Sequence, residues 1–562
     1  MRMDAKPEGL RQSMSWLHTW TGILLGWLLY AVFFTGTLSY FLDEINLWMK
    51  PELHASVPNA SKEQTAQAGL AGMRKLAPQA TTWTLELPNE RQATIQASWR
   101  DKGAAQGRAG TKRAELDAAT GEQIVPRETR GGNFLYRFHF ELHAMPRAVG
   151  RWIVGIATMF MFVAIISGVI THKKIFAEFF TFRPKKGQRS WLDAHNATAV
   201  LALPFHVMIT FSGLLLLMGT LMPWGADVAY NGNGQAYQME RRGVAQPGGQ
   251  GEGRGNREGR EGREGREGRE GRQRDGGGAA PADLSASIGA MLATAQTQWP
   301  EREVGRITVT RPNQRGATVE LQAHGSDSLS TRGRAERLVF DAASGQLKET
   351  PPQAQPGVAA AVNNVFSATH LGRFAGPPLR WLLFLSGVIG TAMVGTGLVL
   401  WVVKRLPERR KLGYTPFGHR LVESTNVAAI AGIALATGAY FWLNRLLPFE
   451  MAGRGAWEIN GFFIVWALSL VHAVLRPARA AWLEQCGAVA LMFVLLPVLN
   501  PLTGGHGLFT SLQLGQGAIA GFDLAMLAIG ALFGTIVLHL RRKEAKKAAS
   551  PAAAPTLAEV RP

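Results

Sequence analysis

The sequence predicts a polytopic α-helical membrane protein with about eight transmembrane helices and two small α+β modules outside the bilayer. Three observations lead to this fold class: eight long apolar runs, basic residues in alternate connections between them, and a polar helix-and-strand unit that occurs twice. An apolar run of about twenty residues is long enough to cross the hydrocarbon layer as a helix. The eight runs cover about residues 16–42, 149–171, 197–221, 379–402, 424–443, 459–475, 481–499 and 521–540.

Lys and Arg residues predict the orientation of the chain. They precede the first run and fill the connections after the second, fourth, sixth and eighth runs, for example at Lys185, Lys404 and Arg541. Because cytoplasmic connections carry the excess of positive charge, we expect both termini on the cytoplasmic side of the membrane. The first run is long and lacks a small-residue cleavage site, so we interpret it as a retained anchor. The net charge of +19 follows largely from this topology, and nucleic-acid binding is not expected.

Two polar segments, at about 43–148 and 222–378, predict the outer modules. Each begins with a helix and continues with three strands, and both third strands run into a similar turn, Ala118–Gly121 in one and Ala342–Gly345 in the other. The predicted elements are helix 61–76 with strands 81–87, 94–99 and 113–117, and helix 283–299 with strands 306–310, 317–323 and 337–341. An insertion of Arg-Glu-Gly repeats at about 240–280 has almost no apolar residues, so we expect it to stay disordered.

The predicted domains follow from these boundaries. They are 1–42 (N-terminus and first span), 43–148 (first module), 149–221 (second and third spans with a basic cytoplasmic loop), 222–378 (second module with the insertion), 379–402 (fourth span) and 403–562 (four C-terminal spans and a cytoplasmic tail). A unit of span, module and span is therefore present twice, followed by a membrane appendix that lacks modules.

Histidines recur at matching positions of the two units and are candidate ligands of haem. His18 and His195 begin the first and third runs, and His143 and His370 precede the second and fourth. Neutral imidazole is a strong ligand of iron, so histidines that face each other inside a helical bundle can hold haem. The duplication predicts one haem b between His18 and His195 and an outer one between His143 and His370. His139 is an alternative to His143, because both lie close together before the second run.

Two more histidines have several interpretations. His206 lies eleven residues beyond His195, on nearly the same helical face and roughly 16 Å deeper. It could bind haem iron opposite a methionine or another histidine, or it could relay protons, because a polar group at mid-membrane depth is usually functional. His172 precedes Lys173 and Lys174, so we expect a contact with a lipid headgroup about as much as ligation of haem.

Glycines in the apolar runs also recur. Eighteen residues after His18 and His195 come Gly36 and Gly213, in the signals Phe-Thr-Gly and Phe-Ser-Gly. We interpret these glycines, together with Gly168, Gly390 and Gly397, mainly as sites where helices pack closely, with room for a flat macrocycle as the second interpretation. The single cysteine, Cys486, excludes an iron–sulfur cluster built by one chain alone.

Several motifs resemble the PepSY-associated transmembrane family over about residues 10–405. The residues that carry the resemblance are Ser15–Gly22, Phe138–His143, Ser167–Lys174, Asp193–Asn196 and Leu203–Thr210. The resemblance, which extends to the ferric-siderophore reductases within that family, implies an inner-membrane haem protein that moves electrons to periplasmic iron complexes. It also implies that the two periplasmic modules are PepSY-like.

The resulting functional hypothesis is a haem b protein with two haems, at the two edges of the membrane and roughly 40 Å apart along the helices. It would reduce a ferric siderophore or another ferric chelate and release Fe(II). No G-x-G-x-x-G motif follows a strand, so the electrons would come from a quinol or a separate cytoplasmic donor. The alternative is a PepSY-containing, membrane-anchored binding or regulatory protein without redox activity. A transporter is a third hypothesis, but few charges lie within the spans.

Overall fold

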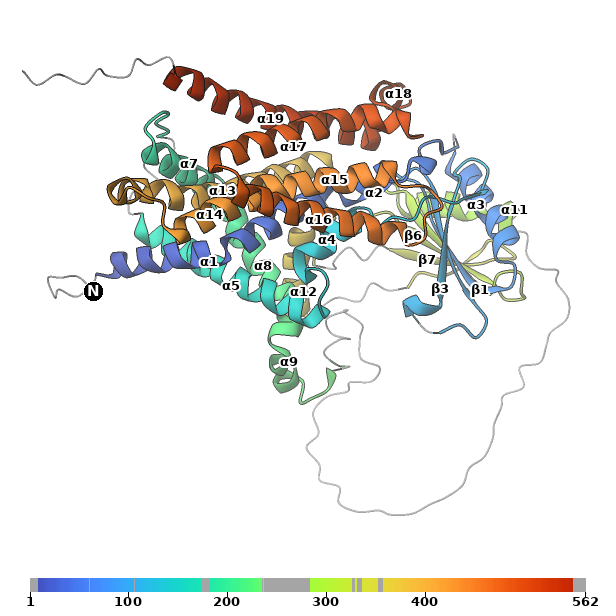
Figure 1. Ribbon diagram of the computed structural model, residues 1–562. Helices are drawn as coiled ribbons and strands as arrows, with labels where there is room; N and C mark the ends of the chain where they lie inside the picture. Colours follow the sequence, from blue (N-terminus) through green and yellow to red (C-terminus); the bar gives the residue numbers. More distant parts are fainter. Residues whose placement is uncertain are drawn as a thin grey trace, which may run out of the picture.

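The computed structural model describes residues 9–59, 61–105, 107–172, 181–234, 236, 284–325, 329–330, 336–351 and 357–548. Lys173, Lys174 and the Arg-Glu-Gly insertion lie outside these residues. Eight described helices are long and apolar enough to cross a membrane, which confirms the predicted fold class. They cover Leu10–Trp48, Arg147–Thr171, Leu203–Leu221, Pro377–Leu412, Phe417–Leu446, Arg454–Leu475, Ala478–Leu502 and Gly517–Arg542. In Figure 1 they form an elongated bundle with a β-sheet at one end, which we call the sheet end.

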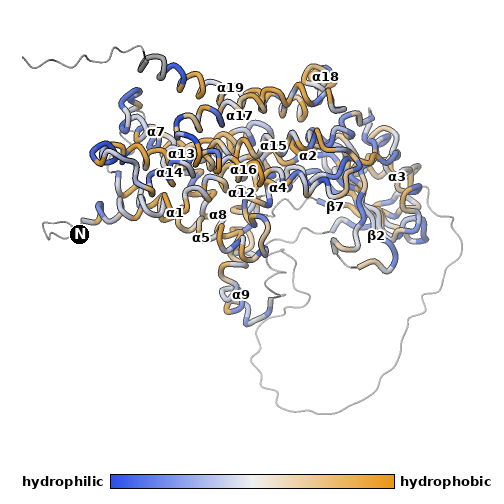
Figure 2. The backbone as a smooth tube through the Cα atoms, in the orientation of Figure 1, coloured by the Kyte–Doolittle hydropathy of each residue, from blue (hydrophilic) through white to orange (hydrophobic). Residues whose placement is uncertain are grey.

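The first four spans form one group of helices. Helix α1 (Leu10–Leu38) packs against α5 (Arg147–Thr171) and α13 (Pro377–Leu412), α13 packs against α7 (Gln188–Leu201), and α5 packs against α8 (Leu203–Leu221). The third predicted run is therefore two helices, which meet at Ala202 because Pro204 begins a new helix rather than continuing α7. Figure 2 shows apolar residues along the bundle and polar residues at its ends and on the sheet.

The remaining spans form the appendix that the sequence predicts. It consists of α14 (Phe417–Val427), a π-helical turn (Ala428–Gly432), α15 (Ile433–Leu446), α16 (Arg454–Leu475), α17 (Ala478–Leu502), α18 (Leu508–Gln513) and α19 (Gly517–Ala548). Helix α15 packs against α16 and α17, and α17 packs against α19. The appendix shares one continuous hydrophobic core with α1 and α5.

The two modules join into one antiparallel sheet of eight strands, in the order β4-β3-β2-β1-β5-β6-β7-β8. The strands are β1 (Ala80–Glu86), β2 (Ile95–Asp101), β3 (Thr111–Leu116), β4 (Gln123–Ile124), β5 (Val304–Thr310), β6 (Thr318–Ala323), β7 (Arg337–Asp341) and β8 (Leu347–Glu349). The six strands predicted from the sequence are all present. The junction between β1 and β5, with Trp83 opposite Val309, was not predicted.

One helix from each module packs on this sheet. Helices α3 (Lys62–Leu76) and α11 (Leu284–Gln298) lie next to each other, and their buried residues share a core with Trp83, Leu85, Ile307 and Val309. Both helices are close to their predicted bounds. Alternation along β1 and β5 places these apolar side chains on the same face, where each strand supplies half of a common core.

Two short helices connect the sheet to the bundle. Helix α4 (Gly132–Glu141) precedes α5 and packs against α1, and α12 (Val358–Leu371) precedes α13 and packs against α8. They occupy equivalent places in the two duplicated units, and each carries a histidine near its C-terminus. Smaller elements are α2 (Leu42–Trp48) and α9 (Pro223–Ala229).

Candidate haem-binding histidine pairs

His18 on α1 and His195 on α7 face each other at the end of the bundle opposite the sheet. The centroids of their rings are 6.1 Å apart. The Nδ1 atom of His18 lies 2.9 Å from the carbonyl oxygen of Ala164, and that of His195 lies 2.9 Å from the carbonyl oxygen of Met393. A carbonyl oxygen can only accept, so Nδ1 of each ring carries the proton and Nε2 keeps its lone pair. This is the tautomer that binds a metal through Nε2.

A second pair lies toward the sheet end. His139 on α4 and His370 on α12 have ring centroids 6.1 Å apart. His139 donates from Nδ1 to the carbonyl oxygen of Val32 at 2.7 Å, and Nδ1 of His370 lies 2.8 Å from the Ser212 hydroxyl. Because that hydroxyl donates to the backbone oxygen of Met208, its own oxygen is available to accept from His370. Nε2 is therefore the free ring nitrogen in this pair as well.

Of the two partners that the sequence offers for His370, the structure places His139 and not His143 next to it. Helix α4 ends at Glu141, and Leu142 has a φ of 56°, which turns the chain out of the helix. The ring of His143 consequently points to the other side and stacks on Phe463 at 5.2 Å. The two histidines are four residues apart, but the helix that would have aligned them stops between them.

Each of the four paired rings lies against a glycine of a neighbouring helix. A Cβ atom on Gly36 would be 2.6 Å from His139, and Cβ atoms on the other glycines would be 3.1–3.3 Å from the facing ring. Those other contacts are Gly168 with His18, Gly213 with His370, and Gly397 with His195. The recurrent glycines of the sequence thus leave space for imidazole rings, which is more specific than general helix packing.

These distances suit one metal ion between the two rings of each pair. Two bonds of about 2 Å from imidazole nitrogen to metal, plus the half-width of each ring, separate the ring centroids by about 6 Å. The ring separation of 6.1 Å in both pairs agrees with this geometry. The residues present therefore fit a haem, whose iron the two histidines of a pair would hold through Nε2.

A cavity of about 870 Å³ opens beside the pair at the sheet end. His139 and His370 line it, together with apolar side chains such as Val32, Phe33 and Leu217. Four arginines also line it, namely Arg91, Arg151, Arg373 and Arg380, together with polar residues such as Asp43 and Asn89. Arg91 and Arg380 are both paired with Glu44, and Arg151 is paired with Glu141. A cavity that combines apolar side chains with cationic groups suits a large apolar ring that carries carboxylates.

Neither His206 nor His172 forms a ring pair with another described histidine. His206 is 1% exposed, and its Nε2 has no hydrogen-bond partner. Its ring and that of Phe33 are arranged edge to face, with the ring centroids 6.3 Å apart. It also lies against a glycine, since a Cβ atom on Gly390 would be 3.1 Å from Nε2. His172 lies 3.0 Å from the amide nitrogen of Asn196 through its Nε2. The structure thus buries His206 in the bundle and gives His172 a polar partner.

The acceptors that orient the histidines were not predicted. Three of them are backbone carbonyls, which leave no signal in the sequence. The fourth, Ser212, stands in the Phe-Ser-Gly signal beside Gly213, so its place in a recurrent motif could have identified it.

A family model described as the PepSY-associated TM region matches residues 15–404, which is more than half of the chain. The chain belongs to this family. The PepSY-associated TM region includes all four paired histidines and both modules, whereas α14–α19 lie beyond it. No curated protein matches the chain.

Proposed function

We propose that this member of the PepSY-associated TM family is a haem b protein of the bacterial inner membrane that reduces a periplasmic ferric siderophore or another ferric chelate. The observation that carries the proposal is the presence of two facing histidine pairs at two depths of one bundle. In both pairs, hydrogen bonds at Nδ1 leave Nε2 free for iron. The duplicated sequence of the chain supports two equivalent haems, one in each pair.

The two histidine pairs lie closer together than the sequence suggested, and a shorter distance supports an electron relay between them. His18 and Val32, whose carbonyl accepts from His139, are fourteen residues apart on α1, which corresponds to about 21 Å along the helix. This is about half of the separation expected from the sequence. The reason is that α4 and α12 pack against the bundle helices, so that His139 and His370 lie deeper than the outer edge.

Haem would supply one-electron chemistry at each pair. The residues of this chain would bind and orient the haem. The hydrogen-bond acceptors set the imidazole tautomers, the glycines make room for the imidazole rings, and apolar side chains exclude water. One electron converts Fe(III) of the chelate to Fe(II), which hard oxygen ligands bind less tightly, and the iron is released. The sheet end, where the two modules lie next to the pair of His139 and His370, is the side where we propose that the chelate docks. A quinol or a separate cytoplasmic donor would reduce the opposite pair.

A visible spectrum of the detergent-purified protein tests the proposal. We expect b-type bands that sharpen with dithionite, two haems per chain by pyridine haemochrome, and reoxidation of the reduced protein by a ferric chelate. His18→Ala and His139→Ala should each remove one haem. A colourless protein from haem-replete cells would refute the proposal and leave the membrane-anchored binding or regulatory protein as the better hypothesis.

A further inference from the structure

We propose that the C-terminal spans position His139, by packing against the face of helix α4 that carries Phe134 and Phe138. This inference rests on the proposed function, because it concerns the haem ligand at the sheet end. It gives α14–α19 a role as the support of α4. These helices lie outside the matched family region but share a hydrophobic core with it.

Three side chains of the appendix that are themselves buried make hydrogen bonds to the segment that leads into α4. The hydroxyl of Tyr440, on α15, donates to the carbonyl oxygen of Gly131 at 2.9 Å, directly before α4 begins. Thr129 donates to a carboxylate oxygen of Glu458 at 2.5 Å, and Arg454 donates to the carbonyl oxygen of Glu128 at 3.1 Å. The start of α4 is therefore fixed by side chains from α15 and α16.

An ion pair holds these side chains in place. Arg454 and Glu458 lie one turn apart on α16, 2.5 Å from each other, and both side chains are fully buried. Asn444 donates to the same carboxylate at 2.9 Å. A buried ion pair contributes little net stability but defines one arrangement of its neighbours, because any other arrangement leaves a charge unpaired. This suits a group that must hold a ligand helix in one place.

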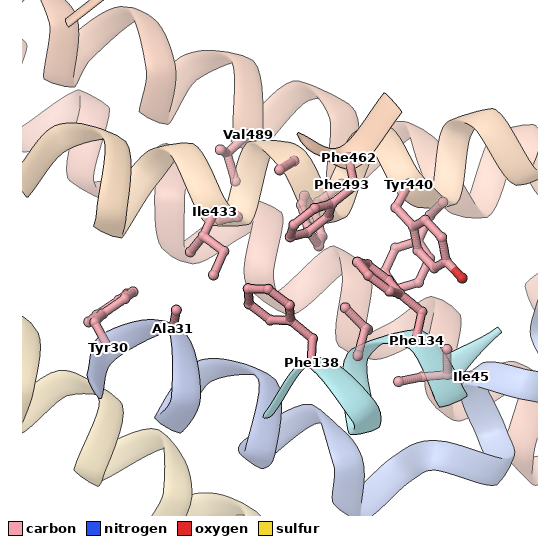
Figure 3. Packing of buried hydrophobic residues seen from close by; sticks show 14 of the residues in the cluster. Tyr30, Ala31, Ile45, Phe134, Phe138, Ile433, Tyr440, Phe462, Val489 and Phe493 are labelled. Carbon is pink, nitrogen blue, oxygen red and sulfur yellow. The ribbon is translucent and has the colours of Figure 1, made fainter. Parts of the chain in front are cut away.

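One face of α4 packs on aromatic side chains of the appendix. Phe134 lies 5.2 Å from both Tyr440 and Phe462, and Phe138 lies 6.2 Å from Phe462, as ring centroid distances. Figure 3 shows Phe134 and Phe138 directed from α4 toward Tyr440 and Phe462. Phe463 and Trp466 extend the contact along α16.

His139 occupies a different face of the same helix. It follows Phe138 by one residue, which is a rotation of about 100° around the axis, and it donates to Val32 of α1. Helix α4 is thus held between α1 and the appendix. Because it has only ten residues, its own hydrogen bonds give little rigidity, and packing on both sides determines where the imidazole lies.

The other three paired histidines lie on helices of the family region, although α1 also meets the appendix where Trp27 donates to Asn426 of α14 at 2.8 Å. His18 lies on α1 and His195 on α7, and His370 lies on α12, which packs against α8 with Phe366 and Phe211 in contact at 5.1 Å. Loss of the contact between Phe462 and α4 should therefore affect the pair that contains His139 and spare the other pair.

The decisive comparison is Phe462→Ala with Phe493→Ala, in full-length protein carrying both haems in lipid nanodiscs. Both side chains are buried in the same core, at 0% and 2% exposure. Phe462 contacts Phe134 and Phe138, whereas Phe493 packs against Gly438 of α15 and lies on α17. The two substitutions remove the same volume and differ in their contact with α4.

We expect Phe462→Ala to disturb the low-spin EPR signal of one haem, namely the signal that His139→Ala abolishes, with loss of at least half of its intensity. The other signal should stay unchanged, and Phe493→Ala should preserve both. A second measurement does not depend on haem. The rate of amide hydrogen exchange in α4, residues 132–141, should rise by at least about tenfold in Phe462→Ala. Tyr440→Phe, which removes one hydroxyl, should raise exchange at the first turn of α4 by a smaller factor.

The inference is overturned if Phe462→Ala retains wild-type exchange in α4 and both EPR signals. It is equally overturned if Phe493→Ala disturbs α4 to the same extent, because the effect would then be general to the core. A protein that binds no haem refutes the proposed function alone, since the exchange experiment still reports whether the appendix holds α4.

Discussion

The imidazole of His139 lies directly on the backbone of Gly36, so close that a Cβ atom there would be 2.6 Å from two ring atoms. Gly36 lies near the C-terminal end of α1, one turn beyond Val32, whose carbonyl accepts from the same ring. Helix α1 therefore supplies both the hydrogen-bond acceptor and the surface for this ligand. The second duplicated unit repeats this arrangement, because a Cβ atom on Gly213 would be 3.3 Å from the ring of His370.

We predict that Gly36→Ala displaces His139 and removes the haem of the sheet-end pair. The added methyl group overlaps the imidazole, and overpacking of this kind costs about 1–3 kcal/mol. Gly22→Ala is the matched control, since it lies on the same helix and a Cβ atom there meets no atom within 4 Å. Haem counts by pyridine haemochrome should fall by half in Gly36→Ala and stay unchanged in the control. Equal counts in the two variants would contradict the assignment of the pair.

His143→Ala should keep both haems, whereas His139→Ala should lose one. His143 is exposed and stacked on Phe463, so its removal leaves the two pairs intact. The measurement is the reduced-minus-oxidised visible spectrum per mole of protein. If His143→Ala lost the haem instead, the iron ligand at the sheet end would be the one that the sequence suggested first.

Ser212→Ala should raise the midpoint potential of the sheet-end haem. The Ser212 oxygen accepts from Nδ1 of His370, and an acceptor at this position makes the imidazole a stronger ligand, which favours Fe(III). Loss of such a partner typically weakens metal binding by about 10–100-fold. Redox titration at fixed pH measures the change, with Thr425→Ala as a control, because the hydroxyl of Thr425 donates to the Leu421 carbonyl of its own helix.

Acidification should weaken the contact between the first module and the appendix. His54 is fully buried: its Nε2 donates to the Leu47 carbonyl at 3.0 Å, and its Nδ1 accepts from the backbone N–H of His506 at 3.1 Å. A proton on Nδ1 would face that N–H. Burial, followed by the charge of Arg445, lowers the pKa of His54 to about 3.

The direction of the pH effect follows from this lowered pKa. In the unfolded chain His54 takes up a proton below about pH 6.5, whereas in the folded protein it stays neutral. Above that pH, His54 is neutral in both states and does not lower the free energy of unfolding. Stability then falls by about 1.4 kcal/mol per pH unit below 6.5, until the folded pKa is reached. Thermal unfolding from pH 7.5 to 5 should show a steeper loss in wild type than in His54→Gln. Parallel curves would exclude His54 as the group responsible.

The sequence was sufficient to predict what depends on local pattern. Apolar runs gave the spans, alternation gave the strands, and the duplication gave the pairing of His18 with His195 as neighbouring residues. Local pattern could not show that Leu142 takes a positive φ, which separates His139 from His143. It also could not show that β1 and β5 pair edge to edge, because backbone hydrogen bonds between distant segments carry no residue code.

The junction of β1 with β5 has a consequence for how the protein is made. The edge of β1 lacks its partner until residues 304–310 have been synthesised, after the second and third spans of the chain. During that interval the backbone groups of β1 are open to pairing with other chains. Biogenesis of this protein thus includes a delay in which a nascent strand must be shielded, and the order of translation, rather than final stability, sets how long that exposure lasts.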